Sequence, residues 1–199
     1  RPSPEEVRAA RRRFRLDRPY LLFVGTLEPR KNIPLLVDMF ERLPGFDGDL
    51  VIAGRRGWKY EPILQRMQNS PRHDRIRLLE DLAEADLSAL YGGAELFVLP
   101  SLYEGFGFPP LEAMACGTPA VVSSGGSLPE VCGDAAVVVP DFDPDHWAHE
   151  VRVLLDAPSR RDALRQRGVA HAARFSWDET ARRTWEVYRA VHARQVKRA

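Results

Sequence analysis

Six short apolar segments recur along the chain, and their pattern constrains the fold more than any other feature. Each is about five residues long and is largely apolar throughout, without the alternation of polar and apolar residues. Such continuous runs are typical of strands that are buried on both faces, as in a parallel sheet covered by helices. The predicted strands are 20–24, 49–53, 75–79, 95–100, 119–123 and 135–139.

Segments that favour helices separate these apolar runs, so strands and helices alternate. This alternation predicts an α/β domain: a doubly wound, Rossmann-like parallel sheet of about six strands with helices on both faces. The last third of the chain contains helical segments only, which predicts a helical C-terminal tail. The predicted helices are 4–16, 33–43, 60–69, 84–91, a helix starting at 109, 128–131, 144–157, 159–175 and 176–195.

Local signals define several helix ends. Ser3 is followed by a proline and, three residues on, by Glu6, which is the signature of a capping box. Asn32 is expected to cap the helix that follows it. Four large aromatic residues in the helical tail are expected to anchor the core rather than to contact a ligand. They are Trp147, Trp177, Trp185 and Tyr188.

The segment from Glu104 to Glu112 is the strongest candidate for a functional site. It follows a predicted strand, contains the sequence Gly-Phe-Gly and leads into a helix through two prolines. Glycines allow backbone N–H groups to approach a ligand, and a helix N-terminus favours an anion. The two glutamates can accept hydrogen bonds from hydroxyl groups. The segment therefore suggests a site for a phosphorylated, polyhydroxylated ligand, although a tight turn with glutamates that complement the helix dipole would give the same pattern.

Two adjacent cations, Arg30 and Lys31, lie in the loop after the first predicted strand. The carboxyl ends of parallel strands are where open α/β sheets bind ligands. An anion-binding role is therefore open to these residues, as is the simpler role of solvated loop cations.

Composition excludes several classes of protein. The net charge of +1 gives no global basic signature for nucleic acid, although Arg8 and residues 11–13 make the first helix locally basic. No segment has the roughly 18 consecutive apolar residues that a membrane span needs. Cys116 and Cys132 are too few for a disulfide framework, and no acidic cluster has the spacing of metal ligands. We therefore expect a cytoplasmic protein without a metal or cofactor.

Four segments, taken in this order, resemble the C-terminal domain of the retaining GT-B glycosyltransferases of family four, most closely its bacterial mannosyltransferase-like members. They are 23–32, 53–58, 100–117 and 125–131, and Phe175-Ser176-Trp177 before a long helix is similar too. The resemblance implies one half of a GT-B fold. It divides the chain into a linker helix from a missing N-terminal acceptor domain (1–17), a donor-binding domain (18–175) and a C-terminal helix (176–199).

The resemblance also implies roles for individual residues. Glu104 would be catalytic and lie beside the transferred sugar, and Glu112 would bind the ribose hydroxyls. Arg30 and Lys31 would neutralise the diphosphate, although many family members have an arginine where this chain has Thr26. The implied donor-binding residues are Gly25, Thr26, Arg30, Lys31, Gly54, Leu79, Gly105, Phe106, Gly107 and Glu112.

The implied activity is retaining, metal-independent transfer of a hexose from a nucleoside-diphosphate sugar to a glycan or lipid-linked acceptor. Mannose from GDP-mannose is the donor expected from the likeness, and the longer protein could lie peripherally on a membrane. The isolated domain should bind donor and transfer nothing. Alternatives are a related sugar-nucleotide epimerase or phosphorylase, and a non-catalytic nucleotide-binding or interaction module. Oxidoreduction is disfavoured because the 105–110 loop lacks the third glycine of the dinucleotide fingerprint.

Overall fold

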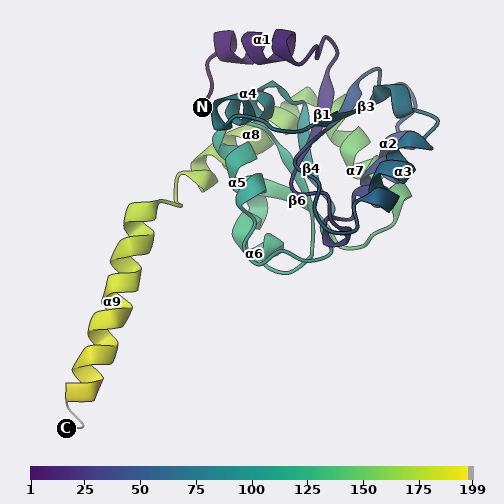
Figure 1. Ribbon diagram of the computed structural model, residues 1–199. Coiled ribbons are helices and arrows are strands. Elements are labelled where there is room, and N and C mark those ends of the chain that lie inside the picture. Colours follow the sequence, from purple (N-terminus) through teal and green to yellow (C-terminus); the bar gives the residue numbers. More distant parts are fainter. Residues whose placement is uncertain (197–199) are drawn as a thin grey trace.

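The structure is a computed structural model that describes residues 1–196, and a six-stranded parallel sheet forms its centre (Figure 1). The strand order is β3-β2-β1-β4-β5-β6. All six predicted strands are present, and each end lies within one residue of its prediction. The strands are β1 (Tyr20–Val24), β2 (Asp49–Ala53), β3 (Ile76–Leu79), β4 (Leu96–Leu99), β5 (Ala120–Ser123) and β6 (Ala136–Val139).

Nine α-helices lie within the described residues, and most of them cover the sheet. The covering helices pack on one another in series: α3 on α2, α2 on α7, α7 on α8, α8 on α5, α5 on α4 and α4 on α1. The helices are α1 (Pro4–Arg13), α2 (Ile33–Glu41), α3 (Glu61–Gln68), α4 (Glu84–Gly93), α5 (Phe108–Ala115), α6 (Leu128–Cys132), α7 (Pro144–Asp156), α8 (Pro158–Ala172) and α9 (Trp177–Val196). Short 3-10 helices span Pro29–Lys31, His73–Arg75 and Gly133–Ala135.

The continuous apolar strands are buried on both faces, which explains their sequence pattern. Successive residues of β1 point to opposite faces, and Tyr20, Leu21, Leu22 and Phe23 are all fully buried. The hydroxyl of Tyr20 donates a hydrogen bond to the carbonyl oxygen of Leu90 at 2.6 Å. The sheet therefore has a single core that continues from one face to the other.

The chain changes direction across the sheet between β1 and β4, the two central strands. From β1 the chain continues to β2 and β3 on one side, and from β4 it continues to β5 and β6 on the other. The loops that leave β1 and β4 therefore both start at the carboxyl edge of the sheet where the strand order reverses, and ligands of open α/β sheets bind at such a place.

The helix signals at the N-terminal end were partly correct. The capping box is present: Ser3 Oγ accepts from the amide of Glu6, and Glu6 accepts from the amide of Ser3. Helix α1 ends at Arg13, short of the predicted end near Leu16. Asn32 adopts a left-handed conformation with φ 52° and its side chain caps nothing, because the preceding 3-10 turn leads directly into α2.

The prediction that the tail aromatics anchor the core is right for one residue and wrong for three. Trp147 on α7 is fully buried, whereas Trp177, Trp185 and Tyr188 on α9 are 75%, 63% and 63% exposed. Figure 1 shows the reason: α9 extends away from the body of the molecule, so its side chains stay exposed even though Trp177 in its first turn stacks on Phe108. Residues 197–199 of the predicted C-terminal helix lie outside the described part of the chain.

No helix within residues 1–196 is long and apolar enough to cross a membrane.

Candidate functional site

Two loops meet at the carboxyl ends of β1 and β4. The loop after β1 carries Arg30 and Lys31 on its 3-10 turn, and the loop after β4 carries Glu104. The amide of Leu102 donates to the carbonyl oxygen of Arg30 at 2.8 Å, which fixes the two loops to each other. The structure thus brings together three residues predicted for the donor site from positions more than 70 apart in the sequence.

Lys31 and Glu104 form a buried ion pair between these two loops. Both residues are 6% exposed, and Lys31 Nζ lies 2.6 Å from Glu104 Oε1. Arg30 adds a second contact, from Nη1 to Glu104 Oε2 at 2.8 Å, and a third from Nη2 to Glu28 at 2.7 Å. Each oxygen of the Glu104 carboxylate therefore faces one cation.

The environment keeps Glu104 ionised. Burial on its own would raise the pKa of Glu104, but hydrogen bonds from Lys31 and Ser101, with a further bond from Arg30, outweigh it and lower this pKa from its ordinary value. A buried carboxylate with this number of donors is a fixed negative charge at neutral pH.

Buried residues that sequence reasoning missed hold Glu104 in position. Ser101 is fully buried, and its hydroxyl donates to Glu104 Oε1 at 2.7 Å. Ser123, at the end of β5, donates to the carbonyl oxygen of Ser101, and Ser127 donates through both amide and hydroxyl to the carbonyl oxygen of Glu104 at 3.0 Å. The signal that could have found them is their place directly after β4 and β5, at the same sheet edge.

Close packing of the loops requires several glycines. A Cβ on Gly54 would lie 2.0 Å from the carbonyl oxygen of Gly25, and a Cβ on Gly126 would lie 2.3 Å from the carbonyl oxygen of Glu104. Gly57 lies against the side chain of Thr26: a Cβ added to Gly57 would lie 2.6 Å from the Thr26 methyl group. Gly25 and Gly54 thus serve the fit between neighbouring loops, and Gly25 also lies against the Lys31 side chain.

The loop from Gly105 to Gly107 presents backbone amides at the start of α5. Gly105 and Phe106 are exposed, and Gly107 is the N-cap residue with φ 109°. Among residues 1–196, no acceptor is bonded to the amides of residues 105, 106 or 107. These donors, next to the positive end of a helix dipole, are suited to an anion.

Glu112 is separate from the Glu104 cluster. It lies on α5, is exposed, and accepts a hydrogen bond of 2.8 Å from the hydroxyl of Tyr91 on α4. Burial first, and then the charge of Glu112, raise the pKa of Tyr91, so its hydroxyl stays protonated and acts as a donor. No hydrogen bond in the described part of the chain joins Glu112 to Lys31, Arg30 or Glu104.

Leu79 is the predicted donor-binding residue that lies on β3. Leu79 ends β3 and is half-buried, and its carbonyl oxygen accepts from the amide of Gly54 at 2.9 Å. The neighbouring Glu80 forms a bidentate pair with Arg56, with both distances 3.0 Å. Arg77 turns away from this edge, since its guanidinium donates to the carbonyl oxygens of Phe14 and Arg15.

Neither thiol has the character of a nucleophile. Burial raises the pKa of Cys132 to about 12 and also raises that of Cys116, so both remain protonated at neutral pH. No group of three or more potential metal ligands occurs within the described residues.

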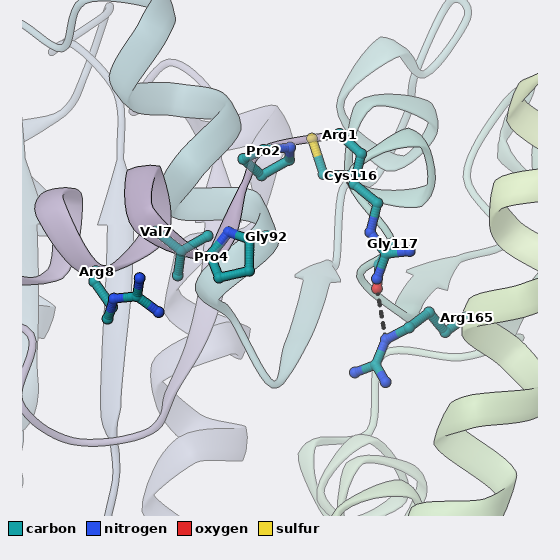
Figure 2. Close-up of a pocket in the computed structure, with 9 residues that line it drawn as sticks. All are labelled: Arg1, Pro2, Pro4, Val7, Arg8, Gly92, Cys116, Gly117 and Arg165. Carbon is teal, nitrogen blue, oxygen red and sulfur yellow. Dashed lines mark hydrogen bonds between the residues drawn. The ribbon is translucent and has the colours of Figure 1, made fainter.

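A separate cavity lies between α1 and the carboxyl ends of α4 and α5. It has a volume of about 640 Å³ and is lined by Arg1, Arg8, Arg165 and the carboxyl ends of α4 and α5 (Figure 2). Arg165 Nε donates to the carbonyl oxygen of Gly117 at 2.8 Å. Cations at this place complement helix C-termini, so we assign this cavity a structural role.

An aromatic groove of about 430 Å³ adjoins the glycine loop and also borders Glu112. Phe106 and Phe108 pack with ring centroids 4.8 Å apart, Phe175 approaches Phe106 edge-on, and Trp177 stacks on Phe108 at 6.0 Å. The groove therefore links the loop before α5 with the first turn of α9.

Comparisons with known proteins agree with this arrangement. The chain is 39% identical over 193 residues to the O-antigen chain mannosyltransferase B of Escherichia coli, covering 95% of this chain and 51% of that protein. It is 34% identical over 199 residues to a D-inositol 3-phosphate glycosyltransferase of Segniliparus rotundus, covering 94% and 44%. The chain thus spans about half the length of these relatives.

Solved structures show the same fold. A sucrose-phosphate synthase of Thermosynechococcus elongatus superimposes with a TM-score of 0.83 at 28% identity, covering 94% of this chain and 49% of that one. The HepE protein of Anabaena in complex with UDP gives a TM-score of 0.86 at 19% identity, covering 95% and 54%. Both are matched over about half of their chains.

The family profile described as "Glycosyl transferases group 1" matches residues 5–171, a range that contains the whole sheet and every residue of the Glu104 cluster. The chain therefore belongs to the group 1 glycosyl transferases, with a fold that matches one half of a GT-B enzyme.

Proposed function

We propose that this chain is the donor-binding half of a retaining glycosyltransferase that moves a hexose, mannose, from a nucleoside-diphosphate sugar to a glycan or lipid-linked acceptor. The observation that carries the proposal is the buried Lys31–Glu104 pair with the half-buried Arg30, next to the amides of residues 105–107, to which no acceptor among residues 1–196 is bonded. It combines cations, amide donors and one ionised carboxylate at the place where an α/β sheet binds its ligand.

This combination suits the chemistry of transfer. A leaving nucleoside diphosphate gains negative charge as the glycosidic bond breaks, and preorganised cations and helix amides stabilise charge where it develops. In the proposed site, Lys31 and Arg30 meet the diphosphate, the glycine-loop amides hold phosphate and sugar oxygens, and Glu104 faces the transferred sugar. The reaction needs no metal in this scheme, because these groups supply the positive charge.

The choice of mannose follows from the relatives. The O-antigen chain mannosyltransferase B and a serotype-specific mannosyltransferase, both of Escherichia coli, are 39% and 34% identical to this chain. We place Glu112 on the ribose, since its exposed carboxylate can accept from hydroxyl groups as it accepts from Tyr91. The acceptor would bind outside this chain, on the remainder of a longer protein.

Titration calorimetry of the chain with GDP, UDP and ADP tests the proposal. We expect saturable binding of one nucleotide, weakened by Lys31→Ala and by Glu112→Ala, with circular dichroism as the control for folding. Binding that is indifferent to both substitutions, or no binding to any of the three nucleotides, would contradict the proposed donor site.

The alternative on the same fold is a non-catalytic nucleotide-binding or interaction module. One observation favours it: the Glu104 carboxylate is already engaged by Lys31, Arg30 and Ser101, as in a purely structural ion pair. Glu104→Gln in the longer protein separates the two. Sugar transfer should fall on the order of 10²-fold or more if Glu104 acts at the reacting centre, whereas a binding module would keep its ligand affinity.

A further inference from the structure

Five cations lie in the loops after β1 and β2, and they differ in their partners. Lys31 and Arg30 are paired with Glu104, Arg30 is also paired with Glu28, and Arg56 is paired with Glu80. Arg55 is exposed, and its side chain forms no ion pair or hydrogen bond with residues 1–196. Lys59 also lacks a carboxylate partner among the described residues, but its Nζ lies 5.0 Å from the centre of the Trp58 ring. Arg55 is therefore the cation in these two loops whose side chain has no ion pair, hydrogen bond or aromatic partner among residues 1–196.

The register of the sheet places Arg55 next to Thr26. Val24 pairs with Ala53 in the parallel ladder, and the same register continues past the strand ends, where Leu27 bridges to Arg56. The amide of Leu27 donates to the carbonyl oxygen of Arg55 at 2.9 Å. Thr26 and Arg55 are therefore neighbours across the two loops, at the same edge as Lys31.

The Glu104 cluster with Glu28, here called the Lys31 cluster, comprises Lys31, Arg30, Glu28 and Glu104, and its charge balance makes the position of Arg55 important. Arg30 and Lys31 carry two positive charges, and Glu28 and Glu104 carry two negative ones, so the four residues sum to zero at neutral pH. A diphosphate that approaches this cluster meets two cations already shared with carboxylates. Two cations in these loops have no carboxylate partner among the described residues: Lys59, which lies over the Trp58 ring, and Arg55, which the register places beside Thr26. Arg55 can therefore add net positive charge at this edge of the sheet.

We propose that Arg55 is a diphosphate-binding residue, which supplies the net positive charge that the Lys31 cluster lacks, beside the neutral side chain of Thr26. The inference rests on the proposed donor site and adds to it a residue that sequence reasoning did not select. A guanidinium binds phosphate oxygens with two parallel N–H donors, and Arg55 has no competing partner to leave. Arg30, by contrast, would have to share its guanidinium with Glu28, Glu104 and the carbonyl oxygen of Tyr103.

Inorganic pyrophosphate is the probe, because it reports on the diphosphate position whatever the nucleotide base. Calorimetric titration compares the unaltered chain with Arg55→Ala, Arg55→Lys and the matched control Arg12→Ala. Arg12 is also exposed and has no ion pair among the described residues, and it lies on α1, which leads into the amino end of β1 at the opposite edge of the sheet.

We expect Arg55→Ala to weaken pyrophosphate binding about tenfold, the size of one charge-assisted contact, and Arg55→Lys to weaken it less. Arg12→Ala should leave the affinity unchanged, and the melting temperature should be the same for all variants. For the nucleotide that binds, Arg55→Ala should weaken the diphosphate form and leave the nucleoside without phosphate unaffected.

The outcomes separate this inference from the proposed function. Unchanged pyrophosphate affinity in Arg55→Ala, with loss in Lys31→Ala, would overturn the role of Arg55 and leave the donor site standing. If Arg12→Ala weakened pyrophosphate binding as much as Arg55→Ala, the loss would be a general effect of net charge, and the proposed role of Arg55 would be overturned as well. The absence of saturable binding of pyrophosphate and of every nucleotide by the unaltered chain would remove the donor site itself.

Discussion

Glu104 is held by the same cations that the proposed diphosphate would use. Lys31 lies 2.6 Å from one carboxylate oxygen and Arg30 lies 2.8 Å from the other. Donor binding at this site must therefore share the cations between carboxylate and phosphate. This arrangement keeps a buried lysine and a buried glutamate compensated when no ligand is present, which avoids the large cost of an unpaired buried charge.

Glu104→Gln should destabilise the chain, because it leaves the buried Lys31 ammonium opposite a neutral amide. We expect a loss of about 2–4 kcal/mol in the free energy of unfolding at pH 7. Since the pKa of Glu104 is lowered in the folded state, the stabilisation is complete above the unfolded value and is lost as pH falls through the folded one. Urea unfolding of both proteins from pH 7 to the acid range checks this: a difference that stays constant with pH would contradict it.

Ser101→Ala removes a buried donor from the same carboxylate. We expect a loss of about 1–2 kcal/mol in the free energy of unfolding, the cost of one hydrogen bond to a charged group. Ser124→Ala is the matched control, since Ser124 is exposed and donates at 3.2 Å to the carbonyl oxygen of Pro140. Equal effects of the two substitutions in urea unfolding would show that Ser101 does not support Glu104.

The residues of the site were predictable to different degrees. The resemblance selected Lys31, Arg30 and Glu104, and the structure brings them within hydrogen-bonding distance. Ser101 was missed because a lone serine carries no signal of its own, and its role depends on burial. Arg55 was not selected for a related reason. Residues 55 and 56 are both arginine, and only the ion pair between Arg56 and Glu80 in the structure distinguishes them.

At the scale of elements, the strand ends control how closely the loops approach. Gly54→Ala would place a Cβ 2.0 Å from the carbonyl oxygen of Gly25. Neither atom can be moved by a side-chain rotation, so one of the two loops must shift. We expect a loss of about 1–3 kcal/mol in the free energy of unfolding. Gly105→Ala serves as the control for folding, because a Cβ there has no neighbour within 4 Å. A lower melting temperature for Gly105→Ala than for Gly54→Ala would contradict this prediction.

Helices and strands were predicted well where a local sequence signal determines them. They were predicted poorly where tertiary contacts determine the structure. Continuous apolar runs gave all six strands, because only a sheet covered on both faces buries such runs. Asn32 looked like a helix cap, but the 3-10 turn before it imposes a left-handed conformation. Trp177 and Trp185 looked like core residues, and no local pattern indicates that α9 leaves the body of the molecule.

At the scale of the whole molecule, neither cavity described above is lined by Lys31, Arg30 or Glu104. One cavity lies at the carboxyl ends of α4 and α5, and the other is the aromatic groove. The Lys31 cluster and the glycine loop supply one wall of a site. This agrees with a chain that spans about half the length of the relatives it matches, where a donor would be enclosed only in the longer protein.

The distal part of α9 should contribute little to the stability of this chain. Trp185, Tyr188 and Val191 are at least 50% exposed, so their removal uncovers no core, whereas Trp177 in the first turn still stacks on Phe108. Ending the chain at Arg183 should change the free energy of unfolding by less than about 0.5 kcal/mol, as for surface changes in general. Trp147→Ala on α7 is the contrast: it should cost about 3–5 kcal/mol, since that side chain is fully buried. Urea unfolding followed by circular dichroism compares the two, and a loss above about 1 kcal/mol on truncation would mean that α9 packs against the body in solution.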